Sequence, residues 1–376
     1  ESDMATITSA QSGYWDDPTT WVGGVVPDLY VDDVVVAGYH TVTADGSYLT
    51  LSNGRNITVE ANGALEVGTQ LTVENGASVY VQGGLYVYAY VDVQGYVQVD
   101  AGGWLDDFGG VAVLYGGSVD AGGSVYVGPY SYFDVVYGSS LYIYGSFYQD
   151  WSAYTYLYQG AYLSVESSGS AYFDGYLYVE DYSALRVYGN AEFSYSGNAE
   201  VRYYGELYVE SGGSLIVRNY LNVVDSGNLY VNGDMTLDGY LYAYGYSQVY
   251  VEYGGTLTIN GYMSVEYYSN LVAYYGGRVN VGRWGSLEAY YYGSIYFDYQ
   301  SRSDLFGYFR LYYDAYLYLG WDAIVRVYRG MDISGQMDSG GGKIVMLRRE
   351  GRINDADGDS LFVFDQAYGH GLTLVA

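Results

Sequence analysis

The chain has 376 residues, of which 54 are Gly and 55 are Tyr, and its formal net charge is -29. Because it has no Cys, it has neither a disulfide framework nor a thiolate metal site. With 14 Lys and Arg against 43 Asp and Glu it is a poor nucleic-acid binder, and no apolar run is long enough for a membrane-spanning helix.

The N-terminal segment, residues 1–45, is expected to form a cap. Trp15 and Trp21 lie near Pro18 and Pro27, and bulky or proline-rich segments cover strand edges that would otherwise stay open. The chain begins with Glu1, which favours a mature protein whose export signal has been removed.

Residues 12–43 contain an ordered set of short phrases: Gly13-Tyr14-Trp15-Asp16-Asp17-Pro18, Trp21, Asp32-Asp33-Val34-Val35-Val36 and Gly38-Tyr39-His40-Thr41-Val42-Thr43. This order resembles the start of G8-type and related β-helix regions of secreted bacterial surface proteins. The resemblance implies an exported, extracellular or cell-surface β-helix protein, and it implies no activity. From the residues themselves, we expect His40 to be a hydrogen-bonded turn residue. Asp32 and Asp33 are expected to begin a strand or accept a backbone amide, with calcium binding as the alternative.

Residues 46–330 repeat a short phrase in which a Gly-containing turn precedes an apolar–x–apolar triplet. Such alternation predicts strands whose outer two residues point inward and whose middle residue points outward. Clear examples are Val79-Tyr80-Val81, Leu85-Tyr86-Val87, Leu141-Tyr142-Ile143, Leu177-Tyr178-Val179, Leu207-Tyr208-Val209 and Leu229-Tyr230-Val231.

Every third phrase falls into register. Three series recur at even and nearly constant steps: Leu185, Leu207, Leu229, Val249 and Leu271; Leu215, Met235, Leu257 and Val279; and Leu65, Leu85, Leu105 and Val125. Three strands per turn of about 20–22 residues predict an all-β fold, a single three-sided parallel β-helix. Gly at most corners is expected to supply the positive φ angles that the bends need.

The outward middle positions are often Tyr, so stacked turns should carry columns of tyrosine at Tyr80, Tyr86, Tyr142, Tyr178, Tyr208 and Tyr230. Two interpretations remain open. Tyr favours strands and covers the backbone with its ring. Alternatively, the columns form an aromatic surface that contacts sugar rings or neighbouring molecules.

The sequence offers little for catalysis. Its only histidines, His40 and His370, lie far apart, which disfavours a triad or a His-based metal site. Asp100 and Asp120 are expected to stack one turn apart, and Asp106-Asp107 to lie on a solvated corner. We therefore expect no enzymatic activity; a polysaccharide-degrading enzyme is the third alternative for the function.

The C-terminal segment, residues 331–376, departs from the repeat and contains three apolar runs that predict strands. Asp355, Asp357 and Asp359 place carboxylates on alternate residues, a pattern that suits either an Asx-type turn or a Ca²⁺ site. No other cofactor is expected.

The charge is uneven along the chain. Residues 1–100 contain one base, Arg55, whereas residues 302–352 contain eight of the 14 bases. An acidic start and a more basic end suit head-to-tail contact between copies, which gives filaments when it does not close. The expected contact residues are Trp15, Trp21, Asp32 and Asp33 at one end and Arg348, Arg349, Arg352, Leu372 and Leu374 at the other.

These observations favour a structural subunit of an extracellular filament or surface layer, with copies of itself as its partner. The alternative is a secreted adhesin or carbohydrate-binding stalk that uses the tyrosine columns to bind glycans or neighbouring filaments.

Overall fold

The computed structural model describes residues 5–46, 48–312, 314–346, 353–355, 363–365 and 372–375. The chain divides into two compact units, one of residues 1–178, 182–185 and 189–191 and one of residues 179–181, 186–188 and 192–376. The fold is the all-β, three-sided parallel β-solenoid that the sequence predicts, with three sheets and about 14 turns. Among the described residues, no helix has the length and apolar character needed to cross a membrane.

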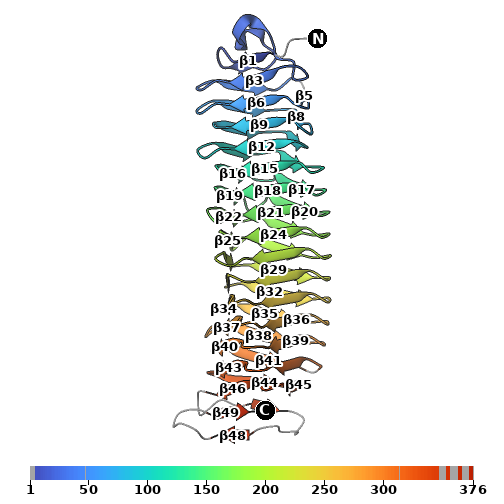
Figure 1. The fold of residues 1–376 in the computed structure, drawn as a ribbon, viewed down its shortest axis with the longest axis vertical. Coiled ribbons are helices and arrows are strands. Elements are labelled where there is room, and N and C mark those ends of the chain that lie inside the picture. The colour runs from blue at the N-terminus through green and yellow to red at the C-terminus, as the bar shows by residue number, and fades with distance from the viewer. Residues whose placement is uncertain are drawn as a thin grey trace. The chain divides into compact units, whose positions relative to one another are not determined.

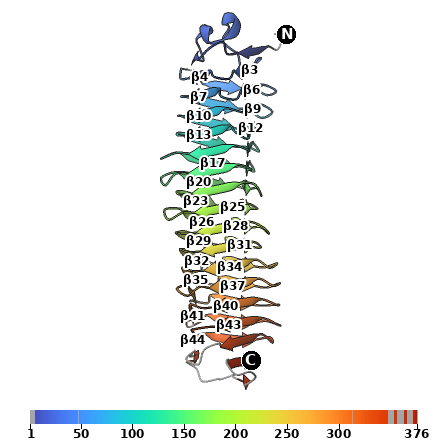
Figure 2. The ribbon, with the colours of Figure 1, turned by 90° about the vertical axis from the view of Figure 1, so that its left-hand side faces the viewer.

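Each turn gives its strands in order to sheet 1, sheet 2 and sheet 3, and the strands of successive turns pair in parallel (Figure 1). In the first unit, sheet 1 contains β1 (Thr6–Thr8), β3 (Asp33–Val36), β6 (Asn56–Val59), β9 (Ser78–Val81), β12 (Tyr96–Val99), β15 (Ser118–Ala121), β18 (Ser140–Ile143) and β21 (Tyr162–Val165). Sheet 2 contains β2 (Gly13–Tyr14), β4 (Thr41–Ala44), β7 (Ala64–Val67), β10 (Gly84–Val87), β13 (Trp104–Asp107), β16 (Ser124–Val127), β19 (Ser146–Gln149) and β22 (Ser170–Phe173) (Figure 2). Sheet 3 contains β5 (Leu49–Leu51), β8 (Gln70–Val73), β11 (Tyr90–Val93), β14 (Gly110–Val113), β17 (Tyr132–Val136) and β20 (Tyr154–Tyr158).

Three strands contain residues of both units: β23 (Tyr176–Val179), β24 (Ala184–Val187) and β25 (Asn190–Phe193). In the second unit, sheet 1 contains β27 (Glu206–Val209), β30 (Asn228–Val231), β33 (Gln248–Val251), β36 (Asn270–Ala273), β39 (Ser294–Phe297), β42 (Tyr316–Leu319) and β45 (Gln336–Ser339). Sheet 2 contains β28 (Ser214–Val217), β31 (Asp234–Leu237), β34 (Thr256–Ile259), β37 (Arg278–Val281), β40 (Arg302–Leu305), β43 (Ile324–Val327), β46 (Lys343–Met346), β48 (Val363–Asp365) and β49 (Leu372–Val375). Sheet 3 contains β26 (Asn198–Val201), β29 (Tyr220–Val224), β32 (Tyr240–Tyr244), β35 (Tyr262–Val265), β38 (Ser286–Ala289), β41 (Tyr308–Leu311), β44 (Gly330–Ile333) and β47 (Ile353–Asp355).

The inward positions build a continuous apolar core within each unit. Leu229 pairs with Leu207 on one side and Val249 on the other, and all three side chains are fully buried. The register predicted from the spacing is therefore confirmed. Turn length varies slightly more than expected, although inward partners from β6 to β45 keep an even separation. The shorter turns include the one that pairs Val79 with Val97, and the longer ones include the turn that pairs Leu271 with Ile295.

Strands of the solenoid also lie outside residues 46–330. Strands β3 and β4 already pair with β6 and β7, although they fall within the segment expected to be only a cap. At the other end, β44, β45 and β46 continue the parallel pairing beyond residue 330. The part of the N-terminal segment that is not solenoid contains two short 3-10 helices, η1 (Pro18–Thr20) and η2 (Val22–Gly24).

Glycine at the corners has a different role from the one expected. Many corner glycines, such as Gly277, do not have a positive φ; a Cβ there would instead collide with the carbonyl oxygen of Val251 on the preceding turn. These glycines allow consecutive turns to approach closely. Many positive φ angles belong to other residues, tyrosine above all.

Candidate functional site

The six predicted column tyrosines lie at outward, half-buried positions of the strands: Tyr80, Tyr86, Tyr142, Tyr178, Tyr208 and Tyr230. Their rings contact aromatic rings on adjacent turns. Tyr208 and Tyr230 stack with 4.5 Å between ring centroids, and Tyr230 and Tyr250 with 5.3 Å. Because neighbouring rings partly cover each other, these columns shield the strands more than they present open ring faces.

A more exposed set of tyrosines lies at the corner between sheet 3 and sheet 1 of the second unit. This corner ladder consists of Tyr246, Tyr267, Tyr268, Tyr291 and Tyr292. Tyr246 and Tyr268 stack at 5.3 Å, Tyr268 and Tyr292 at 5.0 Å, and Tyr267 and Tyr291 at 5.1 Å. Each of the five side chains is about half exposed or more, between 49% and 63%.

The backbone of the corner ladder is in the left-handed region. The φ angles of Tyr267 and Tyr268 are 47° and 65°, and those of Tyr291 and Tyr292 are 44° and 65°. For residues other than Gly, Asn and Asp this conformation costs about 1–2 kcal/mol per residue. The preference of tyrosine for strands cannot explain why tyrosine occupies these turns. Strained backbone positions often lie on functional surfaces. We therefore attribute the presence of tyrosine, rather than Gly or Asn, to its exposed ring.

A second ladder lies at the corner between sheets 1 and 2 of the same unit. Tyr253 and Tyr275 stack at 5.7 Å, Tyr275 contacts Tyr299 edge-to-face at 5.5 Å, and Tyr299 lies 5.6 Å from Trp321. All four rings are exposed. The sequence signal for both ladders is a tyrosine or tryptophan in a short inter-strand turn, repeated once in each turn of the solenoid.

Replacing the corner tyrosines tests whether they serve the fold or its surface. In Tyr268→Asn/Tyr292→Asn, relief of left-handed strain and loss of ring stacking should nearly cancel, since stacking contributes about 0.5–1.5 kcal/mol. We expect the free energy of unfolding, measured by chemical denaturation, to stay within about 1 kcal/mol of the parent value. Tyr208→Asn, in a strand, should instead destabilise the protein. A large loss of stability in the corner variant would instead assign these rings to the fold.

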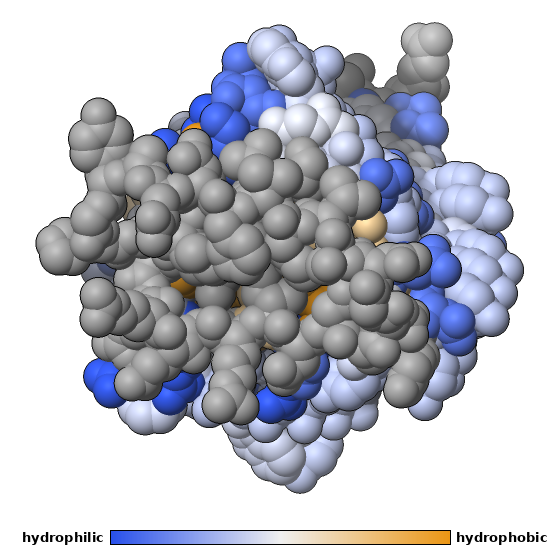
Figure 3. Space-filling model, turned by 90° about the horizontal axis from the view of Figure 1, so that it is seen from below, coloured by the Kyte–Doolittle hydropathy of each residue, from blue (hydrophilic) through white to orange (hydrophobic). Residues whose placement is uncertain are grey.

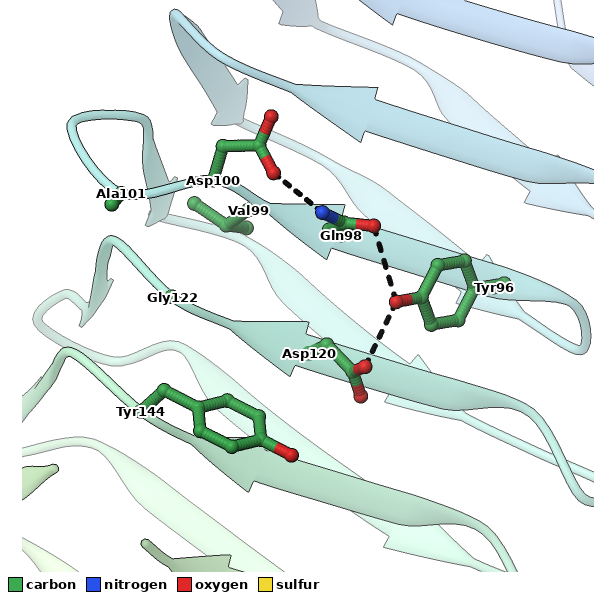
Figure 4. Close-up of a pocket in the computed structure, with 8 residues that line it drawn as sticks. All are labelled: Tyr96, Gln98, Val99, Asp100, Ala101, Asp120, Gly122 and Tyr144. Carbon is green, nitrogen blue, oxygen red and sulfur yellow. Dashed lines mark hydrogen bonds between the residues drawn. The ribbon is translucent and has the colours of Figure 1, made fainter. Parts of the chain in front are cut away.

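Figure 4 shows a shallow pocket of about 220 Å³ on sheet 1 of the first unit, lined in part by Asp100 and Asp120. The Tyr96 hydroxyl donates a hydrogen bond to Asp120 at 2.8 Å, and the Gln98 amide donates to Asp100 at 2.5 Å. Burial, together with the bond to Asp120, raises the pKa of Tyr96. The prediction that Asp100 and Asp120 stack is wrong. Asp120 pairs with Gln98 on the preceding turn, two residues before Asp100.

Asp106 and Asp107 do not form a solvated corner; both belong to β13. Asp106 points outward and is half-buried, whereas Asp107 occupies an inward position between Val87 and Val127 and is fully buried. Its Oδ1 accepts the Gly109 N–H at 3.0 Å, and Oδ2 has no hydrogen-bond partner among the described residues. Burial raises the pKa of Asp107 to about 8.

The predicted contact residues at the N-terminal end lie inside the cap. Trp15 and Trp21 are buried, pack edge-to-face at 5.0 Å, and are joined by a 2.7 Å hydrogen bond from the Trp21 indole N–H to the Trp15 carbonyl. A partner therefore cannot reach the indole rings directly. Asp32 accepts the Asp28 N–H at 3.0 Å.

Asp33 and His40 also have structural roles, as expected. Asp33 begins β3 and accepts the Asn56 N–H at 2.9 Å. The Nδ1 atom of His40 lies 2.9 Å from the Ser9 hydroxyl, so this histidine is hydrogen-bonded beside a turn.

At the C-terminal end, β49 pairs antiparallel with β46 and with β48 of its own chain. This strand contains the backbone of Leu372 and Leu374. A contact to another copy through β49 would require its present pairing to open.

Several predicted residues at this end lie outside the described residues: Arg348, Arg349, Arg352, Asp357, Asp359 and His370. Asp355 is the last residue of β47. In the described part of the chain, no group of three or more His, Asp or Glu could hold a metal ion. Calcium binding by Asp355, Asp357 and Asp359 stays a prediction.

Some of the other basic residues between residues 302 and 352 are engaged locally. Three of them form ion pairs: Arg302 with Asp322 at 3.2 Å, Arg310 with Glu288 at 3.2 Å, and Arg326 with Asp304 at 3.4 Å. These pairs reduce the charge that this region can offer to the acidic end of another copy.

No protein-family model and no curated protein matches the sequence. Among solved structures, the chain is similar to the crystal structure of the TibC-catalyzed hyper-glycosylated TibA55-350 fragment, with 18% sequence identity and a TM-score of 0.38. The match covers 78% of this chain and 93% of that one.

Proposed function

We propose that the chain is a structural subunit of an extracellular filament or surface layer, that copies assemble end to end, and that it has no catalytic role. The observation that carries this proposal concerns sheet 1. Its first strand, β1, and its last strand, β45, each have a strand partner on one side only among the described strands. Strand edges with free N–H and C=O groups readily accept another strand.

The core is also incompletely covered at these two strands. The inward residues Ile7 of β1 and Met337 of β45 are only half-buried, whereas the inward residues Val34 and Leu317 beside them are buried. Figure 3 looks onto the C-terminal end, where mostly hydrophilic side chains are visible at the rim. Docking β45 of one copy on β1 of the next would continue the sheet in parallel and cover both residues.

Export is supported by the resemblance of residues 12–43 to G8-type β-helix regions of secreted bacterial surface proteins. The stacking of the exposed tyrosines favours assembly over the adhesin alternative. In the corner ladder, ring planes differ by only 1–16° and cover one another, so that edges and hydroxyls point to solvent. Binding of sugar rings by stacking needs open faces.

Two matched variants test the end contact. Met337→Lys places a charge at an inward position of the open strand, a device that blocks edge pairing in natural sheets. We expect this variant to stay monomeric in sedimentation velocity and negative-stain images, while Asp338→Lys, at the exposed neighbouring position, assembles like the parent. Filaments of normal length from Met337→Lys would refute docking through β45, and a parent that never polymerises would refute the function.

A further inference from the structure

The corner between sheets 2 and 3 of the second unit carries an arginine–aromatic cluster formed by Arg283, Trp284, Phe306, Tyr308 and Arg329. The Arg283 guanidinium lies 5.2 Å from the Trp284 ring centroid, and the Arg329 guanidinium 4.8 Å from that of Tyr308. Trp284 is 74% exposed, and Phe306 and Tyr308 are exposed as well. Cations held over aromatic rings keep their charge available to an anion.

Arg283 and Arg329 differ from three other arginines of the same unit. Within the described residues neither has a carboxylate at ion-pair distance, although Arg302, Arg310 and Arg326 each have one. Arg278 likewise has no ion pair within the described residues, and what sets Arg283 and Arg329 apart from it is that aromatic rings lie beneath their guanidinium groups. A pair of guanidinium groups on an aromatic platform, Arg283 exposed and Arg329 half-buried, fits a partner that presents carboxylates beside aromatic rings.

The first unit carries a surface of that kind, which we name the acidic ladder: Tyr88, Phe108, Tyr126 and Tyr148 with Asp106 and Asp150. The ring centroids are 5.7 Å apart for Tyr88 and Phe108, 5.8 Å for Phe108 and Tyr126, and 5.6 Å for Tyr126 and Tyr148. Asp106 pairs with Tyr126 between β13 and β16, and Asp150 follows β19 on the next turn. Burial and then the charges of Asp150 and Asp106 raise the pKa of Tyr126.

The acidic ladder has no cation of its own. The sequence contains no Lys or Arg between Arg55 and Arg186. In the second unit, by contrast, several outward carboxylates have an arginine beside them, for example Glu210, which pairs with Arg186 at 2.7 Å.

We propose that the arginine–aromatic cluster of one copy binds the acidic ladder of a second copy, joining the copies side by side. The contact is heterologous, since two different patches meet, and it can therefore extend without closing. It rests on the proposed function, to which it adds a lateral contact beside the end-to-end one.

Charge reversal tests the contact. We expect Arg283→Glu/Arg329→Glu to weaken side-by-side association at least about tenfold in sedimentation velocity at low salt, since close charge pairs dominate such interfaces. Arg278→Glu, a control at an exposed arginine outside the cluster, should associate like the parent. Asp106→Arg/Asp150→Arg should fail to associate alone and should restore association when mixed with the cluster variant. Should the reversal unfold the protein, Arg283→Gln/Arg329→Gln replaces it.

Each outcome has a distinct meaning. Unchanged association of the cluster variant, or failure of the mixture to restore it, overturns the lateral contact. The parent could also bind soluble polygalacturonate at the cluster and show no lateral association. That result would assign the cluster to an acidic glycan and would overturn the lateral contact. If the cluster variant forms single filaments of normal length that no longer bundle, both proposals are supported. If the parent bundles but never extends end to end, only the proposed function is refuted.

Discussion

Leu229→Asp should destabilise the second unit severely. The side chain is fully buried between Leu207 and Val249, so an aspartate there would be an unpaired charge among aliphatic groups. Such substitutions cost several kcal/mol, on the order of 3–5 or more. Chemical denaturation followed by circular dichroism measures the effect.

The matched control is Leu229→Met, which conserves volume and should cost less than about 1.5 kcal/mol. Equal midpoints for the aspartate variant and the parent would show that position 229 does not face the core, and would contradict the register of the whole sheet.

The free energy of unfolding of the parent should fall as the pH rises, and Asp107→Val should abolish most of that fall. The folded pKa of Asp107 is about 8 because of burial, whereas an unfolded Asp titrates near 4. The stability associated with the neutral carboxyl is therefore full below about pH 4 and is lost progressively up to about pH 8. At about 1.4 kcal/mol per pKa unit, the difference is on the order of 5 kcal/mol.

Denaturation midpoints of parent and variant from pH 4 to 9 measure this effect. Burial also raises the pKa of Asp134, to about 6. Both proteins keep that carboxyl, so the difference between them reports Asp107 together with its repulsion by Asp134. Burial also raises the pKa of Asp106, so Asp106→Asn, at the outward neighbour, should remove part of the parent's slope and leave the part that Asp107 contributes. Parallel curves for the parent and Asp107→Val would mean that the carboxyl at position 107 is solvated.

The register was readable from the sequence because most inward residues are apolar and recur at an even interval. Leu207, Leu229, Val249 and Leu271 therefore identify one column without any structural information. A slip of this pairing by one residue would move the apolar side chains to the outer face.

The corner ladders and Asp107 were not predictable in the same way. A tyrosine in a turn looks like a tyrosine in a strand unless the local φ is known, and the sequence rule for positive φ points to Gly or Asn. Asp107 follows Asp106 directly, and a pair of acidic residues normally indicates solvent exposure. Its burial follows only from the position of Asp107 in β13 between Val87 and Val127.

The even separation of inward partners from β6 to β45 also constrains how such a gene can change. A two-residue insertion at a corner, or duplication of a whole turn, leaves every side chain on its original face, which agrees with shorter and longer turns coexisting in one chain. A one-residue insertion would exchange the inward and outward side chains of the following strand. Related chains should therefore differ in length by even numbers within this region, and lineages should grow or shorten by complete turns.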